Sequence, residues 1–208
     1  MRKETKIKKK EIDDKIIAGL ERISSILRIL IWEKVKKVKL SPIQIQFLQY
    51  LENHSPELCI VSNLAEEFGL SQATVSDAIR VLVEKNLIIK TPSQKDGRFY
   101  FLRLTPKGKR ISEEVKDWSL PIKNQLKNFP NEIKEKIMVF LMELITSFQK
   151  EGIINIARMC LACRYFKKDA YPGSEKPHHC LLTNQPLAIS DLKVDCENNE
   201  PKIMENFK

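Results

Sequence analysis

The clearest chemistry in this chain belongs to its cysteines. Four of the five fall in the last third of the sequence: Cys160, Cys163, Cys180 and Cys196. Cys160 and Cys163 form a C-x2-C pair, a spacing that lets two thiolates bind one metal, and the other two would complete a four-thiolate site. This ligand set suits either Zn2+ or an iron–sulfur cluster, and we slightly favour zinc.

The spacing of the cysteines leaves alternatives open. A zinc ribbon usually has a second C-x2-C pair, and a zinc knuckle usually has glycine after the pair, where this chain has Arg164. One of two adjacent histidines, His178 or His179, could replace a cysteine as a ligand, although we expect both in an exposed loop. The cysteines could also be free thiols that bind no metal. The fifth, Cys59, lies in an apolar segment, and we expect it in the core.

A second set of residues predicts a helix that begins after Ser71 and ends near Asn86. Ser71 is a good N-cap. Apolar residues recur at helical spacing behind it and form one face, namely Val75, Ile79, Leu82 and Val83. Asn86 suits the left-handed conformation that often ends a helix.

The opposite face of this helix is polar and suits contact with base edges in the major groove of DNA. Its candidate contacts are Gln72, Thr74, Ser76 and Arg80. Arg80 is the best candidate for guanine, because its guanidinium can donate to two acceptors at once. We expect Ser71 to contact phosphate as well as cap the helix.

A basic hairpin is predicted directly after this helix. Residues 87–90 and 99–104 have the β-branched and aromatic side chains typical of strands, and residues 91–98 between them are rich in turn formers. At the tip of this wing, Lys95 would contact phosphate and Arg98 would contact the minor groove. Asp96 would orient Arg98 through a salt bridge. Taken alone, Asp96 and Arg98 are more simply an ordinary surface pair of little energetic value.

The remaining sequence predicts helices on both sides of this unit. Before it come a solvated lysine-rich arm (1–11), a long helix with an Ile- and Leu-rich stripe (12–38), a helix capped by Ser41 (41–52), a short strand (58–61) and a helix (62–68). After it come a helix that Pro121 should kink or break near Leu120 (105–126), another helix (130–149) and a short helix (153–163).

Four stretches of this region resemble the MarR family of bacterial and archaeal transcription regulators. They are Ala73–Ser76, Leu82–Ile88, Asp96–Arg98 and Leu104–Gly108, in the family's order and spacing. Most relatives have glycine where this chain has Asn86. The resemblance covers about residues 12–156 and implies a winged helix-turn-helix, mainly α with a small β wing. It also favours DNA contact over a plain surface pair for Asp96 and Arg98.

The resemblance implies how the parts are arranged. Residues 12–38 and 109–157 would be helices through which two copies form a homodimer, and residues 39–108 would be the DNA-binding winged helix. Residues 158–208 lie outside the resemblance and would form a metal-binding tail. Such a dimer would bind a pseudo-palindromic operator in double-stranded DNA, with half-sites about 10 base pairs apart. Relatives often bind aromatic or phenolic effectors beside the dimerisation helices, but no residue here identifies one.

Charge and composition agree with a cytoplasmic DNA-binding protein. The formal net charge is +9, which fits a polyanionic partner. The charged N-terminus is unlike a signal peptide, and no apolar run is long enough to span a membrane. We therefore expect a cytoplasmic protein without membrane contact.

Our leading hypothesis is a dimeric transcription regulator, a repressor and not an enzyme, which the four-cysteine site makes responsive to metal or redox state. The alternative is a metal or iron–sulfur redox protein that uses the winged helix as a scaffold or protein-interaction module. The sequence has no nucleotide-binding loop, no Ser/His/Asp set and no thioredoxin-like C-x-x-C context, which counts against an enzyme.

Overall fold

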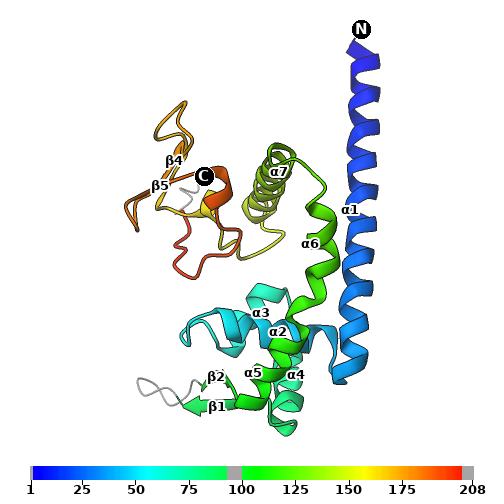
Figure 1. The fold of residues 1–208 in the computed structure, drawn as a ribbon, viewed down its shortest axis with the longest axis vertical. Coiled ribbons are helices and arrows are strands. Elements are labelled where there is room, and N and C mark those ends of the chain that lie inside the picture. Colours follow the sequence, from blue (N-terminus) through cyan, green and yellow to red (C-terminus); the bar gives the residue numbers. More distant parts are fainter. Residues whose placement is uncertain (1, 93–99, 203–208) are drawn as a thin grey trace.

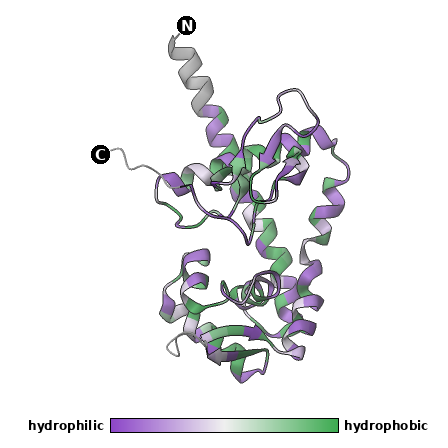
Figure 2. Cartoon of the chain, turned by 90° about the vertical axis from the view of Figure 1, so that its left-hand side faces the viewer, coloured by the Kyte–Doolittle hydropathy of each residue, from purple (hydrophilic) through white to green (hydrophobic). Residues whose placement is uncertain are grey.

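A computed structural model describes residues 2–92 and 100–202 as a mainly helical chain with two small antiparallel sheets (Figure 1). The winged helix (residues 39–108) lies at one end, and a long N-terminal helix extends away from it. The C-terminal part, the cysteine module (residues 153–202), lies beside the last long helix, as the view from the side also shows (Figure 2). Within the described residues, no helix is long and apolar enough to cross a membrane.

The helix-turn-helix begins and ends its helices through local signals. Its three helices are α2 (Pro42–Asn53), α3 (Val61–Phe68) and α4 (Gln72–Glu84). Ser41 caps α2 and Ser71 caps α4, each side-chain oxygen accepting from a backbone N–H three residues further on. Gly69, at φ +61°, turns the chain from α3 towards α4, a conformation that glycine adopts without strain.

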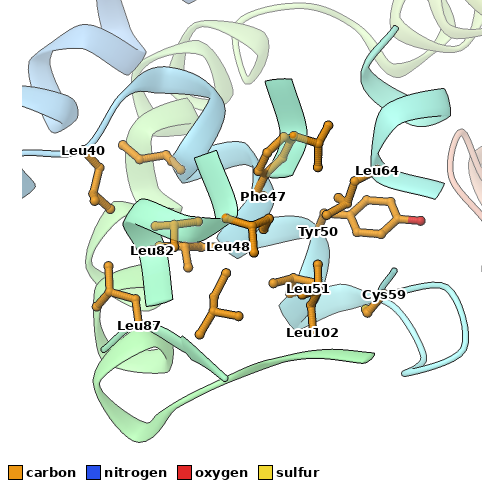
Figure 3. Packing of buried hydrophobic residues seen from close by; sticks show 14 of the residues in the cluster. Leu40, Phe47, Leu48, Tyr50, Leu51, Cys59, Leu64, Leu82, Leu87 and Leu102 are labelled. Carbon is orange, nitrogen blue, oxygen red and sulfur yellow. The ribbon is translucent and has the colours of Figure 1, made fainter. Parts of the chain in front are cut away.

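One hydrophobic core holds these helices together. Phe47, Leu48, Leu64 and Leu82 are completely buried in it (Figure 3). Cys59 is also in this core, as predicted, and burial raises its pKa to about 11. Burying each large apolar side chain contributes about 1.5–3 kcal/mol, so this core fixes the orientation of α4.

The wing is a two-stranded antiparallel hairpin that follows α4 directly. Its strands are β1 (Ile88–Pro92) and β2 (Tyr100–Leu104), paired so that Lys90 lies opposite Leu102. Asn86 has φ +58°, which is the left-handed end of α4 that the sequence predicts. The winged helix-turn-helix predicted from the sequence is therefore confirmed.

Two details of the predicted winged helix are wrong. Residues 58–61 are not a strand, because the N–H groups of Leu58 and Cys59 donate to the carbonyls of Ser55 and Pro56 in turns. Val83 does not join the buried face of α4 but is 37% exposed.

The long helices lie outside the winged helix. α1 (Arg2–Val38) is one helix and includes most of the lysine-rich arm. The predicted 105–126 helix is divided into α5 (Pro106–Val115), the 3-10 turn η1 (Lys116–Ser119) and α6 (Leu120–Leu126). Pro121 falls in the first turn of α6, where its missing N–H costs no hydrogen bond, which explains the break. α7 (Asn131–Lys150) follows.

The cysteine module has little regular structure. It contains the 3-10 turns η2 (Cys160–Ala162) and η3 (Ile189–Asp191) and an antiparallel sheet in the order β3 (Phe166–Lys167), β4 (His178–Cys180), β5 (Gln185–Leu187). The helix predicted at 153–163 is wrong except for η2. Gly152, at φ +71°, ends the α7 helix, and the N–H of Cys160 donates to the carbonyl of Lys193, far along the chain.

A second, smaller core attaches the cysteine module to α7. Met142 of α7 is completely buried in a cluster with Met159, Phe166 and Leu192 of the module. The module is therefore packed on the rest of the protein and does not trail from it as a free tail.

Candidate DNA interface and cysteine site

The polar face of α4 is accessible, as the sequence predicts. Gln72, Thr74, Ser76 and Arg80 are all exposed. The apolar residues on the opposite face of the same helix are completely buried, namely Val75, Ile79 and Leu82. The core thus holds α4 by one face and presents its hydrogen-bonding face to solvent, which is the arrangement that a recognition helix needs.

Arg80 is held by two carboxylates of its own helix. Its Nη1 lies 3.1 Å from Oε1 of Glu84, and its Nη2 lies 3.5 Å from Oδ1 of Asp77. The hydrogen bond to Glu84 contributes most to raising the pKa of Arg80, with Asp77 adding to it. Exposed pairs of this kind are weak, so the guanidinium can exchange them for acceptors on DNA.

The N-terminus of α4 is fixed by the predicted cap. The side-chain oxygen of Ser71 accepts from the N–H of Thr74 at 3.1 Å and lies 2.8 Å from the Thr74 hydroxyl. Both side chains are exposed at the end of the helix where backbone N–H groups favour an anion, such as phosphate.

The described part of the wing adds positive charge next to α4. Lys90 of β1 and Arg103 of β2 are exposed, and Lys90 helps to line a cleft of about 250 Å³ with Ser62, Gln72 and Tyr100. The predicted wing-tip contacts, Lys95, Asp96 and Arg98, lie outside the described residues, so their roles stay predictions.

Comparison with known proteins agrees with this geometry. Residues 39–98 match the model of the MarR family. The winged helix of this chain is therefore similar in sequence to the MarR family. In fold, the chain is similar to Staphylococcus aureus MepR in a DNA complex, with 22% identity and a TM-score of 0.55 over 62% of this chain and 94% of that one. It is also similar to a MarR transcriptional regulator from Methanosarcina mazei Go1, with 21% identity and a TM-score of 0.54 over 64% of this chain and 97% of that one. No curated protein matches the chain by sequence.

Beside the winged helix, the cysteine module brings its four cysteines to one place. Cys160, Cys163, Cys180 and Cys196 all line a cavity of about 100 Å³. None of them is in a disulfide. In the described part of the chain, no group of three or more histidine, cysteine, aspartate or glutamate side chains is already arranged to hold a metal ion.

The thiols around this cavity differ in how readily they ionise. Burial raises the pKa of Cys160, against the opposing effect of the Lys193 N–H, which donates to its sulfur at 3.2 Å. Burial also acts to raise the pKa of Cys180, but hydrogen bonds from the side chain and backbone of Thr183 outweigh it and lower that pKa. Cys180 is therefore the more easily ionised of these two thiols.

His178 and His179 are not the exposed loop residues that the sequence suggested. Both are buried, because β4 lies between β3 and β5 in the small sheet. The N–H of Asp169 donates to Nδ1 of His178 at 3.1 Å, and the Tyr171 hydroxyl lies 3.2 Å from Nδ1 of His179. Neither histidine lines the cavity, so both support the strand that carries Cys180.

The structure adds a contact between the cysteine module and the helix-turn-helix that no sequence pattern indicated. Nη1 of Arg158 lies 2.5 Å from Oε2 of Glu67 on α3, and its guanidinium lies 5.5 Å from the centre of the Tyr50 ring. Oδ2 of Asp195 lies 3.1 Å from Nε2 of His54. We call these five residues the module joint.

The charged side chains of the module joint are partly buried. The side chain of Arg158 is only 10% exposed. Burial raises the pKa of Glu67, although the Arg158 charge acts to lower it, and burial raises the pKa of Tyr50 to about 12. Removing one partner of such a pair is costly, because the other charge is then left buried and uncompensated.

Proposed function

We propose that this chain is a transcription regulator that recognises DNA through α4. The exposed polar face of α4 on a MarR-family winged helix is the observation that carries the proposal. A DNA complex of the similar protein MepR and the net charge of +9 support it further. A winged helix used for protein contact would be expected to expose an apolar face here, where Gln72, Thr74, Ser76 and Arg80 stand instead.

The test is DNA binding measured by fluorescence anisotropy as a function of salt. A labelled duplex from the region upstream of the chain's own gene should bind more tightly than a scrambled duplex, and binding should weaken steeply as salt rises. Arg80→Ala should lower the affinity for the upstream duplex about 5- to 150-fold, because a bidentate contact to guanine contributes about 1–3 kcal/mol.

The matched control removes a cation from a similar i,i+4 ion pair on a helix outside the winged helix. Lys136 of α7 pairs with Glu132 four residues away at 2.7 Å, as Arg80 pairs with Glu84. Lys136→Ala should leave DNA affinity nearly unchanged. Equal losses in the two variants, or binding without preference for the upstream duplex, would contradict recognition through α4.

The acting form is proposed to be a homodimer, because an apolar groove is left open along the long helices. The groove encloses about 830 Å³ between α1, α6 and α7. Large apolar side chains in it are 37–54% exposed: Leu20, Ile23, Ile26, Leu126, Phe129, Ile137 and Leu141. Apolar patches of this kind mark interaction surfaces, and a second copy supplies the same faces by symmetry. Repression, cytoplasmic location and a small-molecule effector stay predictions.

We also propose that the four cysteines bind metal and that the module joint transmits the metal-bound state to α3. The N–H of Cys196 donates to the carbonyl of Arg158 at 2.7 Å. Arg158 is two residues before Cys160, and Asp195 directly precedes Cys196. The two joint residues that belong to the module, Arg158 and Asp195, are therefore linked through the backbone to Cys160 and Cys196. A shift of these cysteines on metal binding would also shift the joint.

This coupling predicts that removing the metal changes DNA affinity through Arg158. Allosteric couplings are typically about 5- to 150-fold, and chelation should change the affinity of the wild-type protein within that range. Arg158→Met should lose most of this response. Arg164→Met is the control, because Arg164 pairs with Glu200 inside the module and not with the helix-turn-helix. An unchanged response in Arg158→Met would refute transmission through the joint.

A further inference from the structure

The cavity that the four cysteines line is larger than one metal ion needs. Four thiolates around Zn2+ lie about 2.3 Å from the metal in a tetrahedron, which places their sulfurs only about 3.8 Å apart and leaves no space between them. Together with nine other residues, the cysteines line a cavity of about 100 Å³, where one water needs roughly 10–15 Å³.

The surroundings of the cavity suit a larger thiolate-bound group. Phe166, Leu182 and Leu187 give it an apolar lining. The Lys193 N–H donates to the sulfur of Cys160 at 3.2 Å. Iron–sulfur clusters are held by four cysteine thiolates, and apolar shielding and N–H donors to sulfur are the means by which proteins tune them.

The cysteines are held apart by backbone contacts that do not depend on a bound group. Cys160 is fixed by its N–H to the Lys193 carbonyl, and Cys196 by its N–H to the Arg158 carbonyl. Cys163 forms an isolated antiparallel bridge with Pro201, and Cys180 is in β4. The backbone positions of the four cysteines are therefore fixed by contacts within the module.

We propose that this cavity is the binding site of an iron–sulfur cluster, with Cys160, Cys163, Cys180 and Cys196 each binding one iron. The slight preference for zinc from the sequence is replaced by this assignment, because the cavity that the cysteines line is larger than one zinc ion needs. The inference rests on the metal-binding part of the proposed function and names its cofactor.

The test is the iron, acid-labile sulfide and zinc content of the full chain purified without oxygen, together with its visible absorption. We expect iron and sulfide in about equal amounts, near four of each per chain for a cluster with one thiolate per iron, and a broad visible absorption. Zinc at one per chain without sulfide would overturn the proposal, as would a protein that takes up no iron after reconstitution with ferrous iron and sulfide.

Cysteine variants distinguish this site from adventitious iron. Cys160→Ala and Cys196→Ala should each lose the visible absorption and most of the iron, whereas Cys59→Ala should keep both, because Cys59 is buried in the other core. Retention of full iron and sulfide by the cavity variants would overturn the assignment. Circular dichroism of each variant checks that its helices are kept, so that a loss of iron can be told apart from a loss of the fold.

This experiment is separable from the test of DNA binding. A chain that contains the cluster but does not bind DNA would overturn the proposed function and leave the cluster site standing. A chain that binds its upstream duplex while carrying only zinc would overturn the cluster assignment alone.

Discussion

Gly108 provides a strict test of how the wing is joined to the helices. It lies in the first turns of α5, and a Cβ built there would stand 2.0 Å from the carbonyl oxygen of Leu87 and 3.0 Å from its carbonyl carbon. That carbonyl also accepts from the N–H of Thr105 at 3.0 Å. Leu87 comes between α4 and β1, so Gly108 touches the point where recognition helix and wing meet.

Gly108→Ala should therefore destabilise the protein, against the usual trend for helices. Replacing glycine by alanine inside a helix normally gains about 0.5–1 kcal/mol. Here the new methyl group lies more than 1 Å inside ordinary contact distance of the backbone, about 3.5 Å or more. Overpacking of this kind costs about 1–3 kcal/mol, which outweighs the helical gain. With the helical gain subtracted, the net cost is at most about 2.5 kcal/mol, so for a chain of this size the melting temperature should fall by up to roughly 10 °C.

The assay is thermal unfolding followed by circular dichroism, with DNA affinity measured on the same samples. Lys109→Ala is the control, since Lys109 is the next residue of the same helix and is exposed. Its melting temperature should stay close to that of the wild type. A Gly108→Ala protein as stable as the wild type, or more stable, would refute the close packing of α5 on Leu87.

Three further changes test other parts of the structure. Ile137→Glu places a charge in the apolar groove, where Ile137 is 50% exposed, and should shift the protein from dimer to monomer in sedimentation without unfolding it. Leu64→Ala removes a completely buried side chain of α3 and should lower the free energy of unfolding by about 2–5 kcal/mol in urea titrations. Tyr50→Phe should be neutral or stabilising in the same titrations, because the buried Tyr50 hydroxyl has no hydrogen-bond partner among the described residues. The packing described above would be contradicted by a stable dimer of Ile137→Glu or by an unchanged free energy of unfolding in Leu64→Ala. A large loss of that free energy in Tyr50→Phe would contradict it as well.

Local signals made the winged helix predictable. The caps at Ser41 and Ser71 and the left-handed residue Asn86 each act within a few residues, and the structure places each where the sequence suggested. The buried and exposed faces of α4 follow from helical periodicity in the same way. The family motifs added the order of these elements, which periodicity alone does not supply.

The cysteine module was less predictable because distant residues determine it. His178 and His179 are buried by strands on both sides, and these strands are only two or three residues long. The N–H of Cys160 is paired with Lys193, so the helix expected there does not form. The sequence could identify the four cysteines by residue type, but it could not predict the size of the cavity that they line.

The module joint shows the same limit. Arg158 and Glu67 are 91 residues apart, and neither lies in a motif. The only notable feature of Arg158 in the sequence is that it comes two residues before the C-x2-C pair. That position does not predict a contact with α3. Long-range ion pairs of this kind depend on how two separately packed cores meet, and the three-dimensional structure is needed to find them.

Hydroxyl-radical footprinting on the upstream DNA tests the central claim most directly. Two copies that each insert α4 into a major groove should protect two segments about 10 base pairs apart, related by an approximate two-fold axis. Arg80→Ala should weaken both segments together. Protection of one asymmetric segment by a monomer, or protection that persists in Arg80→Ala, would contradict recognition of DNA by a pair of α4 helices.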